Sequence, residues 1–172
     1  MEIFPLPKVF YANEWFVIVT FILSSCAVLL VRREFPTSIL ILIYMYSIIM
    51  ARTADNLLAG SELDLYDIMD TDKYELFDVF TYILYGPFGV FFIYFYRRWH
   101  VKGLFTLLYI LTWSLIAIGY EQISVYFNIF TFKEWNQFYS FLVYLFVQSL
   151  LLLFYHLLIT KHPNYQSKSQ DV

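Results

Sequence analysis

Residues 135–160, WNQFYSFLVYLFVQSLLLLFYHLLIT, decide the fold class of this chain. No Asp, Glu, Lys or Arg interrupts the stretch, which lies between Glu134 and Lys161. A helix needs about 20 consecutive apolar residues to cross the ~30 Å hydrocarbon core of a bilayer. The stretch is therefore long enough to span a membrane as one helix, and it predicts an integral membrane protein.

Similar intervals without charged residues lie N-terminal to it, over residues 15–31, 35–51, 79–96 and 103–120. They lack the strict alternation of apolar and polar residues that is typical of a β-barrel. We therefore predict an all-α, polytopic integral membrane protein, a bundle of five transmembrane helices. The predicted spans cover about 14–31, 37–59, 77–96, 103–122 and 136–160, so that residues 1–161 form a single domain. Residues 162–172 are expected to be a disordered cytoplasmic tail.

The composition supports this fold class. Of the 172 residues, 60% are hydrophobic and 15% are charged, whereas soluble domains average about 45–50% and about 25%. The net charge of −3 provides no basic field for nucleic acid, so the lipid bilayer is the predicted partner. Five glycines predict little close helix packing through small residues, and 19 Phe and 16 Tyr supply bulk instead. Frequent Phe, Ile, Tyr and Asn suggest an A+T-rich genome, hence a bacterial cytoplasmic cell membrane.

Lysine and arginine predict the orientation, because they are enriched in cytoplasmic loops. One side of the predicted bundle carries Lys8, Lys73 and Lys133. The other side carries the larger group, which is Arg32, Arg33, Arg97, Arg98, Lys102, Lys161 and Lys168. The N-terminus is therefore predicted to lie outside and the C-terminus inside.

Residues 60–75, GSELDLYDIMDTDKYE, form the longest predicted connector, and it is acidic. The helical spacing of Leu65, Ile68 and Met69 predicts a short interfacial helix. Clustered carboxylates suit a divalent cation, and the candidate ligands are Asp64, Asp67, Asp70 and Asp72. The spacing lacks the glycine and the terminal glutamate of an EF-hand loop, which favours a solvated acidic surface instead. A divalent cation is the one cofactor that the sequence suggests, and no motif identifies it.

Polar residues also gather near the outer ends of three predicted spans. Arg52 and Asp55 are three residues apart and share a helix face, so they can neutralise each other. Charges within spans are candidates for function. We therefore predict an outward-facing polar pocket above a floor that includes Tyr85. Its candidate ligand-binding residues are Arg52, Asp55, Asn56, Asp78, Tyr82, Glu121, Gln122 and Gln148. A purely structural ion-pair network would give the same pattern.

Two features inside the spans lead to further expectations. Pro87 has no N–H group to donate to the carbonyl of Ile83, which predicts a kink and a freed carbonyl oxygen. Gln148 lies near the middle of the last span, where its amide must find a partner on another helix.

Three classes of function follow from these patterns. The first is a non-enzymatic accessory protein, sensor or complex subunit, with a protein partner or a second copy of the chain. The second is a binder or transporter of a small cation or polar solute, using the acidic pocket. The third is a membrane-embedded enzyme acting on lipid or peptide. We expect the first and assign no catalytic residue, because the sequence contains no zinc-helix, P-loop, nucleophile-elbow or dinucleotide-binding motif.

Overall fold

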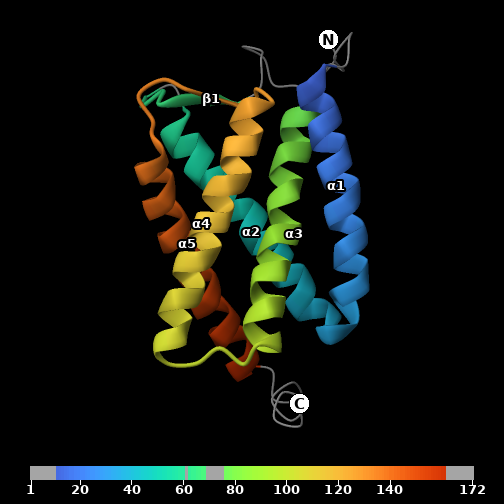
Figure 1. Cartoon of the computed structure of the whole chain (residues 1–172). Coiled ribbons are helices and arrows are strands. Elements are labelled where there is room, and N and C mark those ends of the chain that lie inside the picture. Colours follow the sequence, from blue (N-terminus) through green and yellow to red (C-terminus); the bar gives the residue numbers. More distant parts are fainter. Residues whose placement is uncertain (1–10, 61, 69–75, 162–172) are drawn as a thin grey trace.

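The computed structural model describes residues 11–60, 62–68 and 76–161, with only the backbone described at residues 76–78. Its main feature is a bundle of five helices (Figure 1). The helices are α1 (Ala12–Val31), α2 (Thr37–Leu58), α3 (Leu76–Arg98), α4 (Leu104–Tyr126) and α5 (Gln137–Lys161). A 3₁₀ turn, η1 (Arg32–Glu34), joins α1 to α2, and two short strands are β1 (Tyr66–Ile68) and β2 (Phe130–Phe132). All five helices are long and apolar enough to cross a membrane, which confirms the predicted all-helical class.

The outward faces of the helices are apolar. Large side chains that are more than half exposed include Leu23, Leu30, Ile49, Leu107, Phe146 and Leu153. Such faces suit contact with lipid chains, where helices satisfy their backbone hydrogen bonds internally. Polar side chains are therefore expected to concentrate inside the bundle and at its two ends.

Helix α3 packs against α1, α2 and α5. Two of its glycines allow the close approach of α2. A Cβ atom added to Gly86 would overlap the Tyr44 ring, and one added to Gly89 would overlap the Ser47 side chain. At this interface the two glycines make room for side chains of α2, so small residues contribute to helix packing here despite their low number.

Helix α3 runs through Pro87 as one helix. Because Pro87 has no N–H group, the carbonyl of Ile83 loses its usual partner within the helix. The Tyr44 hydroxyl on α2 donates a hydrogen bond to that carbonyl over 3.3 Å. The freed carbonyl oxygen is thus used to join two helices.

Aromatic rings fill the space between α3 and α4. The ring of Phe92 lies 5.1 Å from Tyr109 and 5.9 Å from Trp113, centroid to centroid. Nearer the other end of the same helices, the ring of Phe88 lies 4.8 Å from that of Tyr120. These distances are typical of favourable ring pairs. Bulky rings therefore set the spacing of the two helices, in line with the high Phe and Tyr content.

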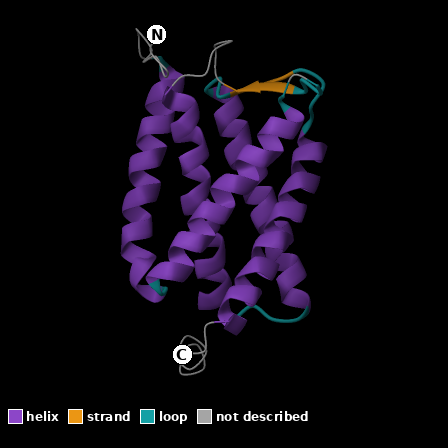
Figure 2. Ribbon diagram, turned by 180° about the vertical axis from the view of Figure 1, so that it is seen from behind, coloured by secondary structure: helices purple, strands orange, loops and turns teal. Residues whose placement is uncertain are grey.

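The strands β1 and β2 form a small antiparallel sheet across one end of the bundle, here called the sheet end (Figures 1 and 2). Tyr66 pairs with Phe132 and Ile68 with Phe130. The interfacial helix predicted for this connector is therefore wrong over residues 66–68. The apolar spacing fits both structures, and pairing with β2, which is distant in sequence, selects the strand. Met69 lies outside the described residues.

The opposite end of the bundle is rich in basic residues. The ends of α1, α3 and α5 and the start of α4 meet there (Figure 1). The described basic residues at these helix ends are Arg32, Arg33, Arg97, Arg98, Lys102 and Lys161. We call this the basic end. Arg97 also connects two elements there, because its Nη1 donates to the Glu34 carbonyl over 2.6 Å.

Candidate functional site

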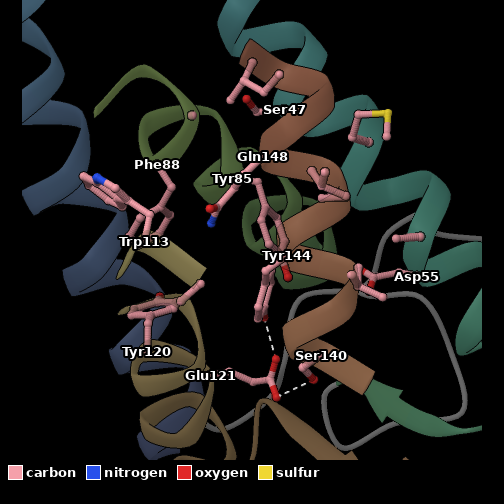
Figure 3. A pocket seen from close by; sticks show the side chains of 18 of the residues that line it. Ser47, Asp55, Tyr85, Phe88, Trp113, Tyr120, Glu121, Ser140, Tyr144 and Gln148 are labelled. Atoms are coloured by element: carbon pink, nitrogen blue, oxygen red, sulfur yellow. Dashed lines mark hydrogen bonds between the residues drawn. The ribbon is translucent and has the colours of Figure 1, made fainter. Parts of the chain in front are cut away.

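A cavity of about 190 Å³ lies among α2, α3, α4 and α5, and residues of the sheet end close it on one side. Lining residues recur about one turn apart along each helix, as in Ser140, Tyr144, Gln148 and Leu151 of α5. Each of the four helices thus presents one face to the cavity. Figure 3 shows Glu121 and Ser140 at one end of it and Ser47 toward the other.

Two carboxylates face this cavity. Asp55 comes from α2 and Glu121 from α4, and their exposed fractions are only 8% and 5%. Among the lining residues that the structure describes, they are the only charged ones. The two groups repel each other electrostatically. Like charges at a buried site are costly unless something of opposite charge compensates for them.

Both oxygens of Glu121 accept hydrogen bonds from the region of α5. The Ser140 hydroxyl donates to Oε1 over 2.7 Å, and the Tyr144 hydroxyl donates to Oε2 over 2.5 Å (Figure 3). Trp135, which precedes α5, donates from Nε1 to the Ser140 hydroxyl over 2.7 Å. This chain of donors fixes the carboxylate and ties α4 to α5.

A residue of the small sheet forms a hydrogen bond with Asp55. The Tyr66 hydroxyl on β1 donates to Oδ1 over 2.5 Å. Burial, followed by the negative charge of Asp55, raises the pKa of Tyr66 far above its ordinary value. Tyr66 therefore keeps its proton and remains a donor at any physiological pH.

The predicted pair of Arg52 and Asp55 is found in a different form. Arg52 donates from Nη1 to the Tyr82 hydroxyl over 2.7 Å, and its guanidinium carbon lies 4.7 Å from the centre of the Tyr82 ring. Arg52 still attracts Asp55 electrostatically, although it does not line the cavity. Its positive charge therefore acts on the carboxylate from behind the cavity wall.

The middle of the cavity carries two further polar groups. Tyr85 of α3 lies near Asp55 and Tyr144 and interacts with both electrostatically (Figure 3). The structure gives its hydroxyl no hydrogen-bond partner among the described residues. Gln148 of α5 accepts a hydrogen bond at Oε1 from the Ser114 hydroxyl of α4 over 3.1 Å. The prediction that Gln148 finds a partner on another helix is confirmed.

The structure brings some of the predicted pocket residues together and separates others. Those that line the cavity are Asp55, Glu121, Gln148 and Tyr85. Arg52, Asn56, Tyr82 and Gln122 lie outside the lining. Asn56 is exposed, whereas the side-chain nitrogen of Gln122 is buried with no partner among the described residues. The side chain of Asp78 lies outside the described residues.

A lysine side chain forms ion pairs with two acidic residues of the predicted connector. Lys133, just after β2, lies 2.7 Å from Asp64 and 2.8 Å from Asp67. The hydrogen bonds that Lys133 donates to these two carboxylates raise its pKa. Asp70 and Asp72 lie outside the described residues. Within the described ranges, no group of three or more His, Cys, Asp or Glu side chains is placed to hold a metal ion.

Sequence reasoning missed the hydroxyl donors Tyr66, Ser140 and Tyr144 as parts of the site. The spacing of residues 140, 144 and 148 places them on one helix face, and this pattern could have predicted that they lie together. Which carboxylate they meet depends on helix order, which no local pattern specifies.

No protein-family model, curated protein or solved structure matches this chain. Function is therefore inferred from the chemistry of the cavity. Its two carboxylates can attract a positive charge, its aromatic rings can contact a cation or an apolar group, and its uncharged hydroxyls orient the acids.

Proposed function

We propose that the chain is a non-enzymatic, multi-pass membrane protein that binds a small cation in the cavity among α2, α3, α4 and α5, as a sensor or solute carrier. The observation that carries the proposal is the presence of two buried carboxylates, Asp55 and Glu121, in one cavity whose described lining residues include no Lys, Arg or His. An accessory subunit or a structural ion-pair network would not need this arrangement.

Electrostatics supports a cation as the missing component. An ionised carboxylate is costly to bury unless it is paired with a positive charge. The hydroxyls of Tyr66, Ser140 and Tyr144 satisfy hydrogen bonds but carry no charge. Arg52 balances part of the charge of Asp55 from outside the lining. A bound cation would compensate for the remainder and relieve the repulsion between the acids.

We also propose an orientation for the protein. The basic end carries six described Arg and Lys residues, Arg32, Arg33, Arg97, Arg98, Lys102 and Lys161, whereas Lys133 is the described basic residue near the sheet. Basic residues favour the cytoplasmic side of a cell membrane. The sheet end and the carboxylates would then lie toward the outer side of the membrane.

Thermal unfolding of the full chain in lipid nanodiscs tests the proposed function. The parent, Glu121→Gln and the matched control Glu134→Gln are melted with sodium, potassium, magnesium, calcium and small organic ammonium chlorides. Glu134 is exposed and lies outside the cavity. A ligand at 100 times its Kd stabilises the folded protein by about 2.7 kcal/mol.

We expect at least one cation to raise the Tm of the parent and of Glu134→Gln in a saturable manner, and to raise the Tm of Glu121→Gln much less. Equal responses in all three proteins for every cation would contradict the proposal.

A further inference from the structure

We infer that the ligand of this cavity is a small primary amine in its ammonium form, attached to an apolar body about the size of one aromatic ring. The inference rests on the proposed function and names the class of cation. It follows from the acceptors at one end of the cavity, the apolar walls at the other, and the volume between them.

The acceptors match the three donors of a primary ammonium group. The Asp55 carboxylate uses Oδ1 for the Tyr66 hydroxyl, which leaves Oδ2 free of that bond. Each oxygen of Glu121 accepts one hydrogen bond from a hydroxyl, and a carboxylate oxygen can accept a second. The Tyr85 hydroxyl, which has no partner among the described residues, supplies a third acceptor between the two acids and the deeper cavity.

The same carboxylates and hydroxyls make a poor binding site for a metal ion. Calcium takes 6–8 oxygen ligands, and magnesium requires near-octahedral oxygen coordination. The cavity offers two carboxylates from different helices, and its remaining lining is mostly apolar and aromatic. Desolvation of a metal ion at such a site would remain largely uncompensated. An organic cation loses less hydration and can use the aromatic walls.

The deeper part of the cavity suits an apolar group. Its walls include Phe88 and Phe92 of α3, Trp113 of α4, and Val147 and Leu151 of α5. Figure 3 shows Phe88 and Trp113 on one side, at a distance from Glu121 and Asp55. A ligand with its charge near the acids would therefore place its uncharged part against these side chains.

The volume limits the size of this group. An apolar cavity of about 150 Å³ accommodates benzene in another protein. The cavity here measures about 190 Å³, which leaves room for a ring and a short aminoalkyl arm.

Isothermal titration calorimetry on the nanodisc-embedded chain, together with Tm shifts, tests the inference with 2-phenylethylammonium chloride. The matched neutral probe is 2-phenylethanol, which has nearly the same shape but no charge. Potassium, magnesium and calcium chlorides test inorganic cations. The variants are Glu121→Gln and Tyr85→Phe, with Glu134→Gln and Tyr139→Phe as controls outside the cavity.

We expect 2-phenylethylammonium to bind saturably, and 2-phenylethanol to bind at least about tenfold more weakly, as the loss of a charged hydrogen-bonded group requires. Glu121→Gln should weaken amine binding by a similar factor and Tyr85→Phe by a smaller one. Neither control should change it. Because Tyr85→Phe removes a hydroxyl with no described partner, it should fold even if an acid variant does not.

The other outcomes overturn the inference in distinguishable ways. Binding of inorganic cations that depends on Glu121, without binding of the amine, would overturn the amine assignment and leave the proposed function standing. Equal binding of the amine and 2-phenylethanol would show an apolar site and overturn both. Binding of neither probe nor any inorganic cation would also overturn both.

Discussion

Two pairs of acidic residues lie near the sheet end, and they differ in what balances their charge. Asp64 and Asp67 are exposed, and both lie within 2.8 Å of the Lys133 Nζ atom. Asp55 and Glu121 are buried in the cavity, where their carboxylates accept hydrogen bonds from uncharged hydroxyls. The exposed pair has its cation within the chain, and the buried pair has none among the described residues that line its cavity.

This difference shows why the number of acids is a poor guide to a binding site. At the surface, water screens the charges and an ion pair contributes little. In the bundle, the effective dielectric constant is lower and two like charges are much more costly. The less acidic region is therefore the stronger candidate for cation binding, because burial and the lack of a lining cation matter more than the count of carboxylates.

The largest expected effect comes from replacing a buried acid with an apolar residue. Glu121→Leu removes the acceptor of the Ser140 and Tyr144 hydroxyls. Each buried donor left without a partner costs about 1–3 kcal/mol. We expect a clear loss in the free energy of unfolding, measured by denaturant titration in mild detergent. Glu134→Leu, at an exposed position, should change it little. If Glu121→Leu is as stable as the parent, these hydrogen bonds do not stabilise the fold.

A smaller loss is expected for Tyr66→Phe. The substitution removes the hydrogen bond that joins β1 to Asp55 on α2. A hydrogen bond to a charged group contributes about 1.5–3 kcal/mol. We expect a lower Tm and faster amide exchange over residues 65–68, since the sheet would lose its hydrogen bond to α2. Tyr139→Phe, which changes a half-exposed residue, is the control. Unchanged exchange in β1 would show that the sheet is held by other contacts.

The smallest effect is expected at the exposed pair. Asp64 and Asp67 raise the pKa of Lys133, so its ammonium group keeps its proton to higher pH in the folded chain than in the unfolded chain. The resulting stabilisation is complete below the ordinary pKa of lysine and is lost as the pH rises through the raised value. The Tm difference between the parent and Lys133→Met should therefore be small at pH 8 and shrink further above pH ~10.4. A difference that grows with pH would contradict this assignment.

The sequence predicted the helices well and the site only in part. Long intervals free of charge fix five apolar helices, because no other structure satisfies the backbone in a bilayer. Asp55, Glu121, Gln148 and Tyr85 were expected in one pocket and do share one cavity. The acidic connector was misread, because the partner of Tyr66–Ile68 is a strand that begins more than sixty residues later, at Phe130. The separation of Arg52 and Asn56 from the cavity depends on side-chain direction, which spacing alone leaves open.

The most direct test of the cation site is a double-mutant cycle on Asp55→Asn and Glu121→Gln, with the free energy of unfolding measured at low salt and without added amine. If the two carboxylates face each other across one cavity, neutralising either one relieves the same repulsion. The effect of the second substitution on the free energy of unfolding should then be less favourable in the presence of the first than in the parent, with a departure from additivity of about 1 kcal/mol or more. Additivity to within about 0.3–0.5 kcal/mol would show that the two acids do not interact. That result would contradict a shared cation site.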